Sequence, residues 1–158
     1  SGHGMMVMVP GNIGRRAVEK RFRFAPEQLL ETGNAWDDAF ELARPFGFRA
    51  FLVAGHPGKI AKLVHGPVDT HSARSGTAAD ILRGILADID PEAEAAGETA
   101  EAIFSSSAPA LSRRLAETCA ERVRSALRET GAAAEVAVWL CGLEGNELGH
   151  AGDLTPWG

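Results

Sequence analysis

Only two cysteines, Cys119 and Cys141, occur among the 158 residues, and they lie far apart in the sequence. A disulfide framework or a zinc site needs more cysteines at closer spacing, so neither is predicted. Cys119 falls on the apolar side of an expected helix, and Cys141 ends an apolar strand. Both are therefore expected to be buried free thiols.

The chain also lacks an excess of positive charge and a long hydrophobic run. It has 16 Lys and Arg against 21 Asp and Glu, which gives a net charge of −5. Nucleic-acid-binding proteins usually carry a basic surface, so that class is disfavoured. No apolar run approaches the roughly 18 residues of a membrane span, and no signal peptide is recognised. A cytoplasmic protein with no membrane attachment is predicted.

Three glycine motifs of large enzyme classes are absent as well. Val53 and Ile60 stand where a Walker loop around Gly58-Lys59 would need a glycine and a Ser or Thr. The turn at 11–14 does not match Gly-x-Gly-x-x-Gly, and there is no Gly-x-Ser-x-Gly elbow. Nucleotide hydrolysis, dinucleotide binding and serine hydrolysis are therefore disfavoured.

What the chain does contain is an alternation of apolar strands and amphipathic helices. Strands are predicted at 5–9, 28–31, 48–54, 136–141 and 147–150, and helices after Asn12, after Asn34, at 56–64, after Thr77 and at 109–130. Asn12, Asn34 and Thr77 are predicted N-caps, because their side chains accept hydrogen bonds from free backbone N–H groups. The order predicts an α/β fold: a Rossmann-like three-layer sandwich with a mostly parallel sheet and helices on both faces.

The domain organisation follows from the same pattern. Residues 5–151 are predicted to form a single α/β domain, and residues 152–158 an irregular tail. Residues 1–4 resemble the remnant of an expression tag, with a native start at Met5 or Met6. The acidic stretch 88–101 is expected to be a solvated helix end and connector.

Chemically useful side chains are densest at residues 55–72, directly after the strand at 48–54. Gly55 and Gly58 would let a ligand approach the backbone, and the helix start would direct free N–H groups at it. Lys59 and Lys62 would lie on one side of that helix. These features predict a seat for carboxylates or phosphates. A tight strand–helix turn with solvated lysines is the alternative, and the spacing alone does not decide between them.

A second cluster follows in the same run, Asp69-Thr70-His71-Ser72. An Asp can orient a His that titrates near neutrality, so this is a candidate acid/base group. The alternative is a loop turn in which Thr70 and Ser72 hydrogen-bond to the backbone. The histidines of the run show no paired metal-ligand motif, so no protein-bound metal is predicted.

The run as a whole closely resembles the signature of the CbiD family, the cobalt-precorrin-5B carbon-1 methyltransferases of anaerobic cobalamin biosynthesis. The matching segments are Gly-His-Pro-Gly-Lys-Ile-Ala-Lys-Leu at 55–63, Asp-Thr-His-Ser at 69–72, Val-Pro-Gly-Asn-Ile-Gly at 9–14, Thr-Gly-Asn at 32–34 and Phe-Gly-Phe at 46–48. The resemblance is strong over 9–72 and looser afterwards, and it concerns the C-terminal portion of the family. The segments 35–38 and 73–77 depart from the family pattern.

The resemblance implies transfer of a methyl group from S-adenosylmethionine to a cobalt-precorrin ring that carries acetate and propionate side chains. It implies a set of substrate- or cofactor-binding residues: Gly11, Asn12, Asn34, Gly55, His56, Gly58, Lys59, Lys62, Thr70 and Ser72. It also implies that His71, oriented by Asp69, lies nearest the reacting ring. Methyl transfer depends mainly on alignment, so positioning should matter more than a strong base.

Family members are longer and have a separate N-terminal domain. The chain is therefore predicted to be the C-terminal domain, or a short homologue, that supplies part of a composite site. An N-terminal domain or partner chain would complete that site, and oligomerisation is left open. One alternative is a non-catalytic module that binds a corrinoid or another polycarboxylate. Another is an unrelated small-molecule enzyme on the same scaffold.

Overall fold

The computed structural model of the chain describes residues 4–66, 76–94, 97–130 and 134–158. Five strands form one sheet in the spatial order β2-β1-β3-β4-β5. The parallel strands are β1 (Met5–Val9), β2 (Leu29–Glu31), β3 (Ala50–Gly55) and β4 (Glu135–Cys141). The edge strand β5 (Glu147–Ala151) runs antiparallel to β4.

The α-helices are α1 (Asn12–Arg21), α2 (Trp36–Ala43), α3 (Pro57–Ile60), α4 (Ala78–Ile89), α5 (Ala100–Ser106) and α6 (Pro109–Glu129). Short 3-10 turns are η1 (Pro26–Gln28), η2 (Arg44–Phe46), η3 (Ala61–His65) and η6 (Thr155–Trp157).

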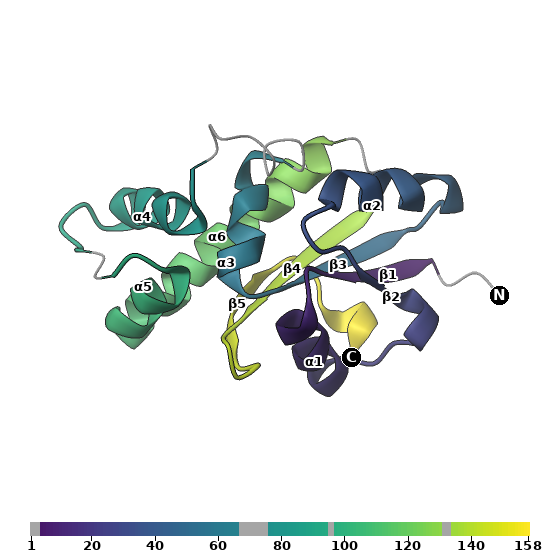
Figure 1. The fold of residues 1–158 in the computed structure, drawn as a ribbon, viewed down its shortest axis with the longest axis horizontal. Coiled ribbons are helices and arrows are strands. Elements are labelled where there is room, and N and C mark those ends of the chain that lie inside the picture. Colours follow the sequence, from purple (N-terminus) through teal and green to yellow (C-terminus); the bar gives the residue numbers. More distant parts are fainter. Residues whose placement is uncertain (1–3, 67–75, 95–96, 131–133) are drawn as a thin grey trace.

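Both faces of the sheet are covered, because successive side chains of a strand point to opposite faces. Phe51 and Val53 of β3 join the apolar cluster that contains residues of α2, α3, α4, α5 and α6. Leu52 and Ala54 join a second cluster with α1 and Trp157 of η6. Figure 1 shows α1 and the C-terminal turn on one side of the strands and α2 on the other. The predicted α/β sandwich, with a mostly parallel sheet and helices on both faces, is confirmed.

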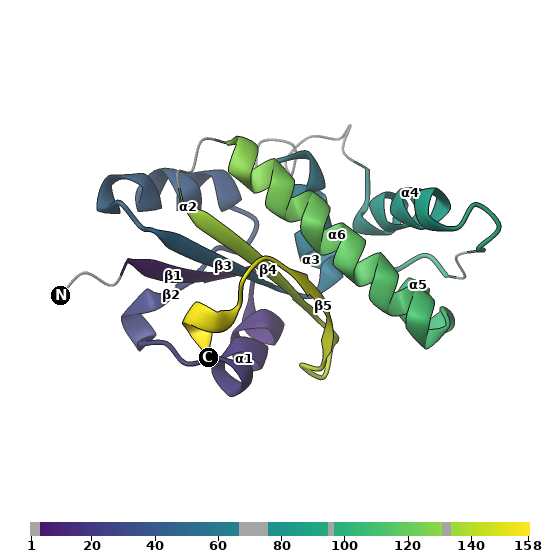
Figure 2. The same ribbon diagram turned by 180° about the vertical axis from the view of Figure 1, so that it is seen from behind.

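The longest helix, α6, packs on the sheet through a regular stripe. Leu115, Cys119 and Val123 follow one another at intervals of four residues and are fully buried. Figure 2 shows α6 lying across β4 and β5. At Gly149 of β5, an added Cβ would lie 2.8 Å from Ala116 Cβ, so the helix approaches this strand too closely for a side chain there.

The helix starts differ from prediction in two of three cases. Thr77 caps α4 as predicted: its side chain accepts a hydrogen bond from the Asp80 N–H at 3.2 Å. Asn12 is instead the first residue of α1 after Gly11, and Ala35, not Asn34, precedes α2. Neither asparagine side chain caps its helix, so those two predictions were wrong. Both amides are left exposed a few residues beyond the ends of strands.

Two further elements differ from the sequence pattern. The helix predicted at 56–64 is one turn of α-helix, α3, that tightens into the 3-10 turn η3. The stretch expected to be a solvated connector ends in α5, which Thr99 caps by accepting from the Ala102 N–H at 3.1 Å. Ile103 and Phe104 of α5 are buried, so this helix is part of the core.

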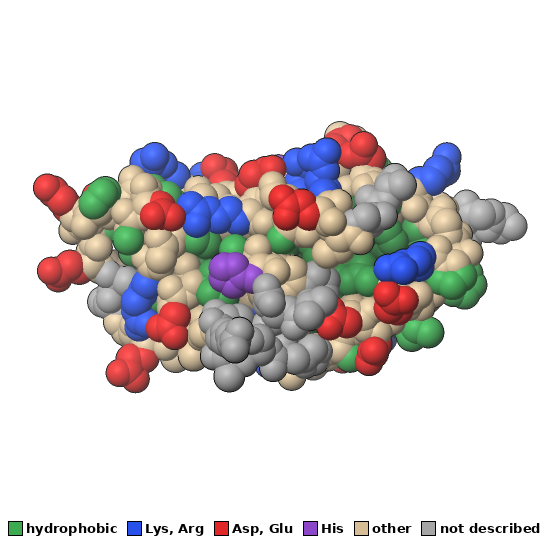
Figure 3. Space-filling view, turned by 90° about the horizontal axis from the view of Figure 1, so that it is seen from above, with side chains coloured by type: hydrophobic (Ala, Val, Ile, Leu, Met, Phe, Trp, Pro, Cys, Tyr) green, Lys and Arg blue, Asp and Glu red, His purple; other side chains and the backbone are tan. Residues whose placement is uncertain are grey.

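Charged side chains of both signs are interspersed over the face seen in Figure 3, and hydrophobic ones gather over the end that carries α2. Two large apolar side chains at the end of α2 and in η2 are exposed, Leu42 by 67% and Phe46 by 74%.

The strand order reverses between β1 and β3. The chain leaves β1 through α1 on one face to reach β2, and it leaves β3 through helices on the other face to reach β4. In sheets wound in both directions, ligands usually bind beyond the carboxyl ends of the strands where the order reverses. The loops after Val9 and Gly55 occupy this position.

Candidate functional site

Residues of the predicted site meet at the carboxyl edge of the sheet. Gly11 and Asn12 follow β1, Asn34 follows β2, Gly55 ends β3, and His56 follows it. The parallel pairing of Val9 with Glu31 brings the first two ends level, and the Thr32 N–H donates to the Val9 carbonyl at 2.8 Å. Sequence segments that lie well apart along the chain are therefore gathered at one edge.

The loop after β1 packs directly on the end of β3. An added Cβ at Gly55 would lie 2.9 Å from Pro10 Cδ, and one at Gly14 would lie 3.1 Å from the Ala54 carbonyl oxygen. The protein's own Pro10 thus fills the space beside Gly55 that the sequence interpretation assigned to a ligand. Packing alone accounts for a glycine at this position.

His56 is held on both sides of its ring. Its Nδ1 accepts a hydrogen bond from the Gly58 N–H at 3.0 Å, and its Nε2 lies 2.9 Å from Glu101 Oε2. Because Nδ1 accepts, the proton of the neutral ring is on Nε2, which donates to the carboxylate. The side chain is 12% exposed. His56 therefore caps α3 and ties it to α5.

The start of α3 has no free backbone donor for an anion. Pro57 has no N–H, and the Gly58 N–H is bound to the His56 ring. The N–H groups of Lys59 and Ile60 both donate to the His56 carbonyl, at 3.0 and 3.1 Å. The predicted contribution of free N–H groups was therefore wrong. The side chains of Lys59, which is exposed, and Lys62, which is half-buried, form no ion pair within the described residues.

The predicted acid/base cluster lies outside the described residues. The structure describes the chain up to Gly66 and again from Gly76 onwards. The predicted cluster, Asp69, Thr70, His71 and Ser72, falls between these two residues. The roles assigned to these four residues remain predictions.

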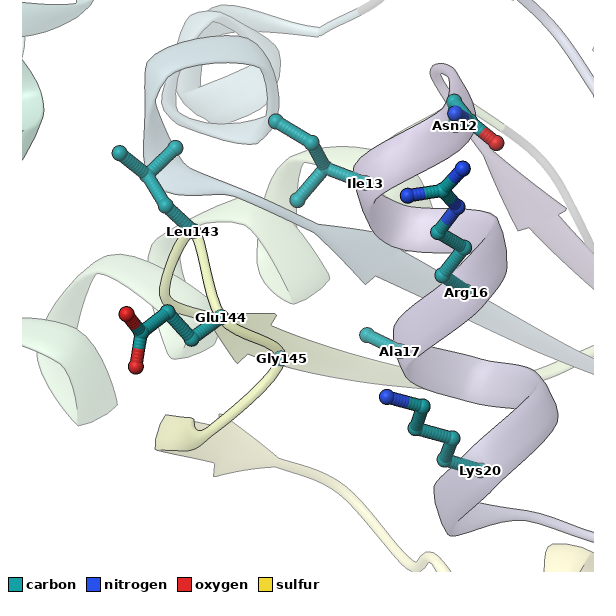
Figure 4. Close-up of a pocket in the computed structure, with 8 residues that line it drawn as sticks. All are labelled: Asn12, Ile13, Arg16, Ala17, Lys20, Leu143, Glu144 and Gly145. Atoms are coloured by element: carbon teal, nitrogen blue, oxygen red, sulfur yellow. The ribbon is translucent and has the colours of Figure 1, made fainter.

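A pocket of about 240 Å³ adjoins this edge, between α1 and the turn at 142–146 that joins β4 to β5. Figure 4 shows the residues that line it, which are Asn12, Ile13, Arg16, Ala17, Lys20, Leu143, Glu144 and Gly145. Gly145 adopts a positive φ of 84°, and an added Cβ there would lie 3.6 Å from Ala17 Cβ. The small residues at both positions let the turn pack against the helix.

The pocket was not predicted from the sequence, although the residues of one of its walls show a recognisable helical spacing. Asn12, Arg16 and Lys20 recur every four residues and so lie on one side of α1. The opposite wall comes from the far end of the chain, and no local pattern relates it to α1. Another pocket, of about 290 Å³, lies at the amino ends of β1, β3 and β4, away from the carboxyl edge.

Cys141 ends β4 near the carboxyl edge, but it is not suited to act as a nucleophile. Burial raises the pKa of its thiol to about 11, and that of Cys119 to about 12. A thiol needs a lowered pKa to react readily as the thiolate at neutral pH. Both cysteines are buried and unpaired, as predicted.

In the part of the chain that the structure describes, no cluster of three or more His, Cys, Asp or Glu side chains is arranged to hold a metal ion. None of the described helices is long and apolar enough to cross a membrane.

Comparison with known proteins gives one consistent name. A protein of Syntrophotalea carbinolica named cobalt-precorrin-5B C(1)-methyltransferase is 38% identical over 96% of this chain and 43% of its own length. One of the same name from Chromobacterium violaceum is 30% identical over 92% of this chain and 42% of its own length. One from Methanococcus vannielii is 38% identical over 52% of the chain and 22% of its own length.

These matches confirm the predicted family resemblance. The chain spans less than half the length of the curated relatives it matches, which is consistent with the predicted correspondence to their C-terminal portion. No family model matches the chain, and no solved structure matches it.

Proposed function

Because the sequence matches cobalt-precorrin-5B C(1)-methyltransferases over nearly its whole length, we propose that this protein supplies part of the site at which a cobalt-precorrin ring is methylated. The observation that carries the proposal is the gathering of Asn12, Asn34 and His56 after three neighbouring strands, where the strand order reverses. These residues belong to three of the five segments that resemble the family.

The described side chains at this edge suit a substrate with several carboxylates. Lys59 and Lys62 present ammonium groups with no ion-pair partner in the described structure, and these would bind the acetate and propionate groups of the ring. The exposed amides of Asn12 and Asn34 are not used as helix caps and are available to hydrogen-bond to the same groups. These four residues would hold and orient the ring.

S-adenosylmethionine, when bound, would supply an electrophilic methyl group to a nucleophilic ring carbon. The chain's contribution to that step is alignment, which can lower a barrier by several kcal/mol, on the order of 7–11 in the best cases. We assign His71, oriented by Asp69, to the position nearest the reacting ring. An N-terminal portion or a partner chain would provide the rest of the site.

Calorimetric titration tests the proposal. The chain is titrated with S-adenosylhomocysteine and with a cobalt corrinoid that carries free carboxylates, and binding of the corrinoid is expected. The double variant Lys59→Gln/Lys62→Gln should raise its Kd about tenfold, which corresponds to about 1.4 kcal/mol. Arg128→Gln, which removes an exposed positive charge at the far end of α6, should leave the Kd unchanged. If neither ligand binds, the proposal is overturned.

The role of His71 has a separate test. Methyl transfer is measured with the N-terminal portion of a relative supplied, and His71→Ala is compared with His65→Ala, which removes an exposed histidine. Loss of transfer in His71→Ala alone supports the assignment, and equal rates remove it. Tight corrinoid binding with no transfer by the unmodified protein would indicate the alternative function, a non-catalytic corrinoid-binding module.

A further inference from the structure

We infer that the pocket between α1 and the β4–β5 turn seats a carboxylate carried on an apolar carbon chain. The inference rests on the proposed function and deepens it: the ligand group would be an acetate or propionate side chain of the tetrapyrrole ring. The pocket's charge, its apolar surface and its position each support this assignment.

The pocket carries positive charge that no ion pair among the described residues neutralises. Arg16 and Lys20 line it and form no ion pair within the described residues. The neighbouring Arg15 differs, because it is paired with Glu19 at 3.1 Å and lies 3.9 Å from Glu31. Glu144 also lines the pocket, but its carboxylate points away from α1 in Figure 4. The guanidinium and ammonium groups are therefore available to an anion.

The pocket also exposes apolar surface. Ile13 is 43% exposed and Leu143 is 51% exposed, and these are two of the four exposed large hydrophobic residues in the described structure. Both line the pocket, one from each wall. An inorganic anion would leave this surface in water, whereas a carboxylate on a hydrocarbon chain would cover it. The combination selects an organic carboxylate.

The position of the pocket connects it to the edge where the ring is proposed to bind. Asn12, the first residue of α1, directly follows the loop after β1 and also lines the pocket. Gly14, in the first turn of α1, packs against the end of β3. A ring held over the ends of β1 and β3 would thus place a peripheral side chain within reach of α1.

Two sources could supply such a carboxylate, the ring and the methionine end of the methyl donor. The methionine end carries an ammonium group beside its carboxylate and would need an acidic partner close to the two cations. The only acid among the pocket's lining residues, Glu144, faces away from them. The geometry therefore favours the ring side chain.

The test compares two corrinoids and three proteins by calorimetry. The corrinoids are one with free carboxylates and its fully amidated counterpart. The proteins are the unmodified chain, Arg16→Gln/Lys20→Gln, and the matched control Arg15→Gln on the same helix. The double variant should bind the free acid about tenfold more weakly, while Arg15→Gln changes its Kd less than twofold. Affinity for the amidated corrinoid should not respond to the double substitution.

Each contrary result is distinct. If the unmodified chain binds the free acid and the double variant binds it equally well, the pocket assignment is overturned and the proposed function stands. If the unmodified chain binds no corrinoid, the proposed function falls and this inference falls with it. If the double substitution weakens the binding of S-adenosylhomocysteine instead, the pocket binds the methyl donor and not the ring. Equal thermal midpoints of the three proteins are expected, because all the altered side chains are exposed.

Discussion

The imidazole of His56 lies 2.9 Å from the carboxylate of Glu101, a residue 45 positions further along the chain. The contact joins the turn after β3 to α5, a helix that sequence periodicity did not predict. The same ring caps α3 through the Gly58 N–H. His56, which lies in a segment that resembles a ligand-binding signature, thus also belongs to the framework that shapes this segment.

Replacing Glu101 should destabilise the fold modestly. Glu101→Ala removes the acceptor of the His56 proton, and a hydrogen bond to a charged group contributes about 1.5–3 kcal/mol. Because Glu101 is 42% exposed, solvent screening reduces the expected loss to about 1 kcal/mol. Urea unfolding measures the change in free energy, with Glu98→Ala, an exposed carboxylate nearby, as the control. Equal losses in the two variants would show that the His56 contact contributes nothing.

The close packing of Pro10 on Gly55 predicts a clear difference between two glycines. In Gly55→Ala the new Cβ would meet the rigid Pro10 ring at 2.9 Å, and overpacking of this kind costs about 1–3 kcal/mol. Gly11→Ala introduces a Cβ that lies more than 4 Å from any described neighbour, so the stability of this variant should change little. Chemical denaturation of both variants checks this. A fully tolerated Gly55→Ala would mean that the two loops are not in close contact.

The capping box of α4 should make stability depend on pH. Hydrogen bonds from Thr77 to the Asp80 carboxylate, supported by Arg83, hold the pKa of Asp80 below its usual range. A group whose pKa is lowered on folding stabilises the protein above its unfolded pKa, which is about 4, and loses this effect as pH falls through the folded value.

Asp80→Asn should therefore lower the urea midpoint at pH 7, and the difference from the unmodified protein should shrink toward pH 3. Glu92→Gln, which alters an exposed carboxyl with no side-chain hydrogen bond or ion pair in the described structure, serves as the control. A difference that stays constant over this range would rule out the proposed linkage.

Both thiols should be unreactive in the folded protein. Burial raises the pKa values of Cys119 and Cys141 to about 12 and about 11, so at pH 8 almost none of either is thiolate. An aromatic disulfide reagent should react with neither residue until denaturant is added, and then with both. Rapid reaction of one thiol in native buffer would show that its environment opens to solvent.

Much of the architecture could be predicted from local sequence. The four-residue recurrence of Leu115, Cys119 and Val123 fixes the buried face of α6, because an α-helix returns to the same side about every four residues. The apolar run of β3 predicts a strand covered on both faces. The short helix α5 was not predicted, because the acidic run before it masked the apolar spacing of Ile103 and Phe104.

The predicted site was only partly determined in this way. The chain order placed Asn12 and His56 correctly just after strands, and the family resemblance selected them. The hydrogen bond of the Gly58 N–H could not be predicted, because its acceptor is the His56 ring and the bond depends on the orientation of that ring. The caps assigned to Asn12 and Asn34 were wrong because α1 begins one residue earlier and α2 one residue later than predicted.

By itself, the sequence determined the order and type of most elements, the covering of the sheet on both faces and the family resemblance, because these depend on residue type and short-range periodicity. Only the tertiary structure decided that Pro10 occupies the space beside Gly55, that Glu101 holds His56, and that Arg16 and Lys20 face Leu143 across a pocket. Each of these is a spatial relationship between segments distant in the chain. Such relationships are set by how helices and loops pack on the sheet, and no local pattern encodes that packing.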